Sequence, residues 1–253
     1  MDTLCSYEAL PFPEPADVDA SPISNYPTNF RGVPSPVPLP WGLKSFGSAV
    51  SGMDELPDGR TRFWIRHEVL KDVTPRMLAW WFAHLEGDVV VGGRRIDRYR
   101  VWHPYDHIHV GYARRRSDGT VGPGAVLRIK EILGGNPNYL VDITSEIEKL
   151  DEEGFIHNPV VHGIRGLARM EYSFRAVPGG TLYENCLVFG SRHPMLRVLQ
   201  PLVRWLAFPE GKGETWLRHN IEEVGMLERF LPDLYRKEME GYAPDLPSDR
   251  PRR

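Results

Sequence analysis

The sequence contains little cysteine, since only Cys5 and Cys186 occur among 253 residues. This does not indicate a disulfide framework, and a reducing compartment fits best. The chain also lacks an uninterrupted apolar stretch of the roughly 20 residues that a membrane-spanning helix requires. Its N-terminal segment, with the acidic Asp2, lacks the apolar region of a secretion signal. We therefore expect a soluble, cytoplasmic protein with no membrane partner.

An excess of positive charge is also missing. The 31 Lys and Arg residues against 34 Asp and Glu give a formal net charge of −3, so nucleic acid is not an expected partner. The basic run 114–116 leads directly into Ser117-Asp118-Gly119, a turn signal, and fits a solvated hairpin tip. Hydrophobic residues make up 41% of the chain, which is enough for a sizeable core in one large domain.

Proline is concentrated at the N-terminus and suggests how the chain is divided. Nine of the 23 prolines lie in residues 1–41, where they remove backbone donors and fix φ. We expect residues 1–45 to form a proline-rich arm, with Tyr26, Phe30 and Trp41 as anchors. Residues 46–240 are then the functional domain, and residues 241–253 a flexible tail.

The domain is expected to be an α+β protein in which an antiparallel sheet wraps a long C-terminal helix. Thr74-Pro75 has the residues of a helix start, with Thr as N-cap and Pro at the first helical position. Alternating apolar residues predict strands, and a period of 3.6 predicts helices. The predicted strands are 62–67, 97–112, 125–133, 167–177 and 182–190, and the predicted later helices are 197–206 and 214–235.

His219 and Glu223 lie one turn apart on one face of the last predicted helix. Their neighbours on that face are apolar: Trp216, Met226, Leu227 and Phe230. The predicted solvent face carries Arg218, Glu222, Arg229 and Asp233. A carboxylate among apolar side chains must be paired, neutralised or bound to a metal ion. A hydrogen-bonded helix pair without metal is the simpler interpretation of His219 and Glu223 alone.

Two other segments offer matching ligands. Glu131 has the strand parity of the apolar Leu127 and Ile129, so we expect it to point inward, where a buried salt bridge to arginine is the alternative. The segment 99–107 carries His103 and His107 at the same parity, and His103 is the alternative to His107 as a ligand. Two imidazoles and two carboxylates suit zinc. Asp106 or another carboxylate could orient a ligand histidine.

The stretches Tyr99-Arg-Val-Trp-His-Pro-Tyr-Asp-His107 and Trp216-Leu-Arg-His-Asn-Ile-Glu-Glu-Val-Gly-Met-Leu-Glu-Arg-Phe-Leu-Pro-Asp-Leu-Tyr235 resemble the 2,4-diacetylphloroglucinol (DAPG) hydrolase family, which includes phloretin hydrolase-type enzymes. The similarity covers most of residues 60–240, with a weaker match at His162-Gly-Ile. It implies a helix-grip (Bet v 1-like) domain that encloses a cavity, and it is the only ground for expecting a homodimer.

The resemblance also implies a reaction and a site. The reaction is hydrolysis of the carbon–carbon bond between an acyl group and a phenolic ring or in a β-diketone, with a small phenolic or diketone molecule as substrate. The implied zinc ligands are His107, Glu131, His219 and Glu223. Tyr99 and His162 are the implied catalytic, substrate-contacting residues, and Val110 stands where a polar substrate contact is expected.

Several alternatives stay open at this point. His162 could instead cap the turn at Gly163, and Tyr99 could be a sheet aromatic at the cavity edge. Two histidines with carboxylates also suit Fe²⁺ and oxygen chemistry, and the same scaffold could serve a metal-dependent lyase or cyclase. A helix-grip cavity can also act as a non-enzymatic carrier of apolar ligands.

Overall fold

A nine-stranded antiparallel sheet forms the body of the protein in a computed structural model that describes residues 35–191, 208, 209 and 211–240. The strand order is β1-β2-β11-β10-β9-β8-β7-β6, with β3 paired to β11, and β4 and β5 form a separate hairpin. The strands are β1 (Ala49–Glu55), β2 (Thr61–His67), β3 (Leu70–Lys71), β4 (Asp88–Val91), β5 (Arg94–Asp97), β6 (His107–Arg114), β7 (Val126–Ile132), β8 (Leu140–Asp151), β9 (Gly154–Pro159), β10 (Ala168–Val177) and β11 (Gly180–Phe189).

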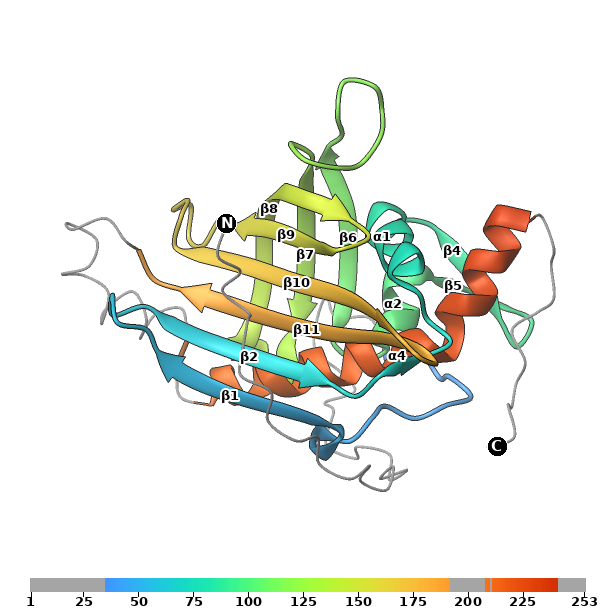
Figure 1. The fold of residues 1–253 in the computed structure, drawn as a ribbon, viewed down its shortest axis with the longest axis horizontal. Coiled ribbons are helices and arrows are strands. Elements are labelled where there is room, and N and C mark those ends of the chain that lie inside the picture. Colours follow the sequence, from blue (N-terminus) through green and yellow to red (C-terminus); the bar gives the residue numbers. More distant parts are fainter. Residues whose placement is uncertain (1–34, 192–207, 210, 241–253) are drawn as a thin grey trace.

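One long helix, α4, lies across the curled sheet, with two shorter helices at one end of the molecule (Figure 1). The α-helices described are α1 (Pro75–Ala83), α2 (Arg98–Trp102) and α4 (Lys212–Glu240), and the 3₁₀ turns are η1 (Phe46–Ser48), η2 (Leu133–Gly135) and η3 (Pro137–Tyr139). This is the helix-grip arrangement that the resemblance implied, so the predicted fold class is confirmed.

The helix start predicted at Thr74-Pro75 is confirmed. The Thr74 side chain accepts a hydrogen bond from the Met77 backbone N–H at 3.2 Å, and Pro75 is the first residue of α1. The predicted strand 97–112 is wrong in its first half, where α2 forms instead. The reason is Asp97, whose side chain caps this short helix by accepting from the backbone N–H groups of Tyr99 and Arg100.

No strand was predicted for residues 140–159, where the structure has β8 and β9. The predicted helix 197–206 lies outside the described residues. So do Tyr26 and Phe30, most of the predicted arm and the predicted tail. Trp41 is half-buried against the core, and the backbone N–H of Val37 donates to the Pro104 carbonyl at 3.2 Å. The domain boundaries remain predictions.

The core lies between α4, α1 and the concave face of the sheet. Phe230 of α4 and Trp81 of α1 are both fully buried, and their rings meet edge to face at a centroid distance of 5.1 Å. Among the described residues, no helix is long and apolar enough to cross a bilayer. The structure also records Cys186 as disulfide-bonded, a bond that the composition did not indicate.

Replacing Phe230 by Ala should lower the free energy of unfolding by about 3–5 kcal/mol, because it leaves a cavity at the contact between α4 and α1. Chemical denaturation followed by circular dichroism measures the change. Met239→Ala is the control on the same helix: its side chain is 52% exposed, so its effect should stay within about 0.5 kcal/mol. Equal effects of the two substitutions would contradict the assignment of Phe230 to the core.

Candidate metal centre

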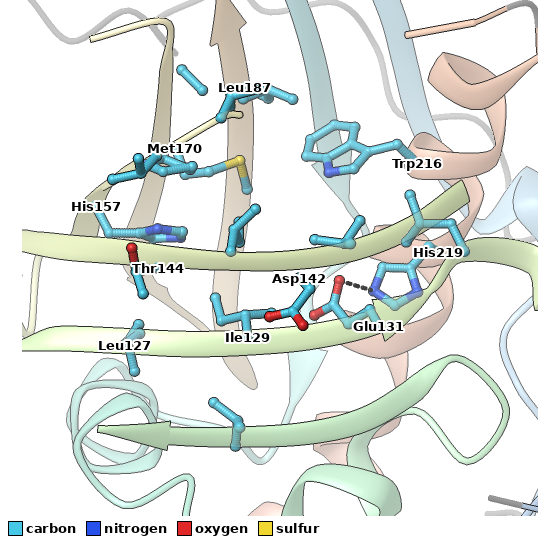
Figure 2. Close-up of a pocket in the computed structure, with 18 of the residues that line it drawn as sticks. Leu127, Ile129, Glu131, Asp142, Thr144, His157, Met170, Leu187, Trp216 and His219 are labelled. Atoms are coloured by element: carbon cyan, nitrogen blue, oxygen red, sulfur yellow. Dashed lines mark ion pairs between the residues drawn. The ribbon is translucent and has the colours of Figure 1, made fainter. Parts of the chain in front are cut away.

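Three segments bring the four predicted ligands together. The register of the sheet places His107, the first residue of β6, opposite Glu131 of β7. His219 and Glu223 come from adjacent turns of α4, and both are buried. Figure 2 shows Glu131 and His219 facing each other, with 3.7 Å between the nearest carboxylate oxygen and Nε2 of His219. The apolar helix face predicted for His219 and Glu223 is the buried one, and Glu131 points inward as its strand parity predicted.

The ring of His107 is fixed on one side and open on the other. Its Nδ1 lies 2.7 Å from the backbone carbonyl of Tyr99, so that nitrogen carries the proton and donates it. The Tyr99 ring stacks on the imidazole at a centroid distance of 3.7 Å. Nε2 is buried without a hydrogen-bond partner in the described part of the chain. It lies 3.3 Å from a Glu223 oxygen and 3.7 Å from a Glu131 oxygen.

His219 is oriented in the same way, but by a carboxylate. Its Nδ1 lies 2.9 Å from Oδ2 of Asp106, which leaves Nε2 to face Glu131 and Glu223 at 3.7 and 3.8 Å. Asp106 also accepts hydrogen bonds from the backbone N–H groups of Gly134 and Gly135. The expected orienting role for Asp106 therefore has the required geometry: a carboxylate that holds the outer nitrogen of a ligand histidine.

These distances fit a metal site, and three of the side chains, those of His107, Glu131 and His219, form a group that could hold an ion. Zinc binds imidazole nitrogen and carboxylate oxygen at about 2.0–2.2 Å, which separates tetrahedral ligand atoms by roughly 3.3–3.6 Å. The Nε2 atoms of His107 and His219 lie 3.3–3.8 Å from the carboxylate oxygens. Glu223 is not in that group, but one of its oxygens lies 3.3 Å from Nε2 of His107 and 3.8 Å from Nε2 of His219. The ion's identity is not fixed by this geometry.

In the metal-free protein, burial and neighbouring charges shift the pKa values of the groups in the cluster. Burial alone would lower the pKa of His219, but the hydrogen bond to Asp106 and the charges of Glu131 and Glu223 outweigh it and raise this pKa to about 10. Burial raises the pKa of Glu223 to about 8, with Glu131 adding to the rise and His219 opposing it. Burial, followed by repulsion from His219, holds the pKa of His107 well below its usual range.

His103, the alternative ligand, lies behind the cluster. Its Nδ1 accepts from the backbone N–H of Asp106 at 3.1 Å, and its Nε2 lies 3.2 Å from Glu222. With Asp106 and His219 it forms a second buried group with metal-ligand spacing. Glu222 and Asp233 are buried, so the solvent face predicted for α4 is wrong at these two positions. The helical phase alone could not reveal that α2 and the turn after it cover this side.

The cluster forms part of the wall of a cavity of about 520 Å³, a typical size for a small-molecule site. Glu131, His219 and Glu223 line it, and much of the remaining wall is apolar. Tyr99 also lines it, and its hydroxyl donates a hydrogen bond to Glu131. Burial, followed by the charges of Glu131 and Glu223, raises the pKa of Tyr99 well above its usual value, so the phenol stays protonated.

The two histidines of the β9 region differ in position. His162 is exposed at the cavity rim, with a φ of +48° in the turn between Val161 and Ile164. His157, which the sequence analysis did not single out, lines the cavity and is buried. Its Nδ1 lies 2.6 Å from Oγ of Ser145 and its Nε2 3.4 Å from the Tyr172 hydroxyl. Burial lowers the pKa of His157 to about 3.

A strand-parity signal for His157 was present in the sequence. Phe155, His157 and Pro159 alternate along β9 and are all buried, whereas Ile156 and Asn158 are not. Tyr172 of β10 is buried, and its side chain also lines the cavity. These two residues place hydrogen-bonding groups on a largely apolar wall, with His157 stacked on Phe155 at 4.8 Å.

The fold and the site together define a helix-grip protein with a buried histidine–carboxylate cluster beside a cavity. Residues 46–143 match the family model of the DAPG hydrolase PhiG domain, so the resemblance is confirmed over this part of the chain. The matched segment includes His107 and Glu131 and ends before His219 and Glu223. No curated protein matches the chain.

Two solved structures illustrate the likeness in fold. One is Ara h 8.0201, with 15% identity and a TM-score of 0.38 over 67% of this chain and 99% of that one. The other is a START superfamily protein from Mycobacterium smegmatis, with 18% identity and a TM-score of 0.43 over 66% of this chain and 95% of that one. At these values, neither structure bears on function.

Asp106→Asn should weaken zinc binding by about 10- to 100-fold, because it removes the charge that holds the Nδ1 proton of His219. Competition with a chromophoric chelator measures the dissociation constant. Asp118→Asn is the matched control, because Asp118 lies in an exposed hairpin turn where it accepts from Thr120 and pairs with Arg116. It should leave the dissociation constant unchanged. The same affinity in both variants would refute an orienting role for Asp106.

Zinc affinity should rise with pH between about 6 and 8. In the metal-free protein the pKa values of about 10 for His219 and about 8 for Glu223 mean that both groups hold protons at pH 7. Metal ligands must be deprotonated, so binding displaces these protons and is weaker at lower pH. Calorimetry in buffers with different ionisation enthalpies should detect release of about one to two protons per ion. Binding without proton release would rule out these residues as ligands.

Proposed function

We propose that this chain is a zinc-dependent hydrolase that cleaves the carbon–carbon bond between an acyl group and a phenolic ring, or the equivalent bond of a β-diketone. The family match over residues 46–143 supports this reaction class. The observation that carries the proposal is the buried, unpaired Nε2 of His107. It faces Glu131 and Glu223, two carboxylates on the wall of a cavity of small-molecule size.

The proposed reaction adds water across one bond. The acyl carbon gains the hydroxyl group of water and leaves as a carboxylic acid, while the ring carbon gains hydrogen and leaves as the deacylated phenol. When that bond breaks, its electron pair moves to the ring. Prior protonation of the ring carbon gives a β-diketone-like tautomer, from which the departing group is an enolate that hydrogen-bond donors can stabilise.

His107, Glu131, His219 and Glu223 would hold the ion. A divalent ion bound there supplies Lewis-acid polarisation of a substrate oxygen. Tyr99 is the neighbouring donor: its phenol keeps its proton because its pKa is raised by burial, and it lines the cavity beside Glu131. In the proposal, the Tyr99 hydroxyl, which donates to Glu131 in the structure, transfers this hydrogen bond to the oxygen on which charge accumulates as the enolate leaves.

The opposite wall supplies neutral polar groups. Because burial lowers the pKa of His157 to about 3, its imidazole is uncharged at working pH and serves as a neutral hydrogen-bonding group of the wall. Its contacts with Ser145 and Tyr172 hold the ring in place. His162 remains a candidate general acid–base, and its exposed position at the rim lets it exchange protons with solvent.

The partner that the proposal requires is a small phenolic or diketone molecule. A homodimer and a cytoplasmic location remain predictions from the family resemblance and from the sequence.

Replacing His219 by Ala should abolish both zinc retention and acid release, because it removes one ligand and leaves Asp106 buried without its partner. The assay incubates the zinc-loaded protein with acylphloroglucinols and β-diketones in ¹⁸O-labelled water and follows the products by mass spectrometry. The wild-type protein should release a carboxylic acid that carries one solvent oxygen. Elemental analysis of the purified protein distinguishes zinc from iron.

His84→Ala is the control, since His84 is the exposed residue directly after α1, where its ring bonds to the Trp80 carbonyl and stacks on the Trp80 ring. It should retain metal and activity. Unchanged acid release by the His219 variant would refute the site, and dependence of turnover on O₂ instead of water would refute the reaction class.

A further inference from the structure

The cavity changes character on the side of α1, β6 and β7. Its wall there is made of aliphatic and aromatic side chains: Phe82, Leu85, Val110, Leu127 and Ile129. Figure 2 shows Glu131 and His219 at one end of the view and Leu127 at the other. This apolar lobe, defined by those five residues, is a continuation of the space next to the metal cluster.

The strand β7 sets the direction in which a bound molecule extends. Glu131, Ile129 and Leu127 alternate along one face of it, so Ile129 lies about 7 Å and Leu127 about 13 Å from Glu131. The sheet register places Val110 of β6 directly opposite Ile129. A molecule with its reacting carbonyl near Glu131 therefore passes between Val110 and Ile129 to reach Leu127.

A polar group beside Val110 would find few partners, whereas Thr144 and His157 lie at the far end of the lobe, near Leu127 (Figure 2). Val110 is 5% exposed and carries no donor or acceptor in its side chain. The hydroxyl of the nearby strand residue Tyr112 is already used, since it donates to the Phe82 carbonyl and accepts from the Leu85 backbone N–H. The indole Nε1 of Trp102 is itself buried, so a ligand in the cavity cannot reach it. A substrate hydroxyl here would lose its water without replacement.

We propose that Val110 is a specificity-determining residue and that the substrate carries an alkyl or unsubstituted aryl group on the side that faces it. This inference rests on the proposed function and names its substrate class, acyl phenols or β-diketones that carry an apolar substituent. In the bound molecule, that substituent lies beside Ile129 and Leu127, which are two and four residues from Glu131 along β7. Burial of apolar atoms strengthens binding by about fourfold per methylene. An unpaired hydroxyl weakens it by about tenfold.

The test compares pairs of acyl phenols that are identical except for one ring substituent, propyl or hydroxyl. Calorimetry gives Kd and product analysis gives kcat/KM, both with the full-length, zinc-loaded protein. We expect the wild-type protein to bind the propyl member at least tenfold more tightly. Val110→Thr replaces a methyl group by a hydroxyl at nearly constant volume, and it should reduce that ratio by about tenfold.

His109→Ser is the control, because His109 lies in the same strand but is exposed. It should leave the ratio unchanged. Leu127→Ala serves as a second variant if Val110→Thr does not fold, as judged by circular dichroism. By lengthening the lobe, it should shift the preferred substituent from propyl to a longer chain.

The results separate the two proposals. A wild-type preference for the hydroxyl member, or a ratio unaltered by both Val110→Thr and Leu127→Ala, would overturn the role of the lobe even if acid is released. If no member releases acid but the preference and its changes occur as expected, the inference on ligand class stands and the hydrolase proposal fails.

Discussion

Two carboxylates, the buried Glu223 and the partly buried Glu131, face the same two imidazole nitrogens, and this concentration of charge dominates the structure around it. Nε2 of His107 lies 3.3 Å from one carboxylate and 3.7 Å from the other. Such a group costs free energy in a low-dielectric interior unless a cation or protons compensate it. The raised pKa of Glu223, which follows from burial with Glu131 nearby, reflects that cost. A divalent ion would offset it and thereby stabilise the folded chain.

The scaffold around the cluster connects elements that the sheet alone would leave independent. Asp106 holds His219 of α4 and, at the same time, the backbone of Gly134 and Gly135 in the turn after β7. The Tyr99 carbonyl fixes His107 from α2. Each imidazole therefore has its outer nitrogen occupied and its inner nitrogen directed at the carboxylates. A loss of either outer contact would release a ring without removing a ligand, which is why orientation and ligation are separable here.

Much of the cluster could be predicted because it depends on local periodicity. The 100° rotation per residue put His219 and Glu223 on one helix face, and strand parity put Glu131 inward. Other features depend on contacts between distant segments. Residues 98–102 alternate like a strand, yet the Asp97 cap and the turn at Pro104 make a helix. This helix and turn bury Glu222 beside His103, a position that helix phase alone assigned to solvent.

The charged residues of the cavity and the apolar residues that determine its shape lie on different parts of the fold. The proposed ligands come from the start of β6, the end of β7 and α4. The apolar lobe is formed by α1 and the residues just after it, by a later position of β6 and by earlier positions of β7. Because side chains two residues apart on a strand share a face, Ile129 and Glu131 touch one space but contribute opposite properties to it. A change at Val110 or Leu127 can therefore alter what fits without moving a charge, whereas a change at Asp106 alters the charges and leaves the shape of the lobe intact.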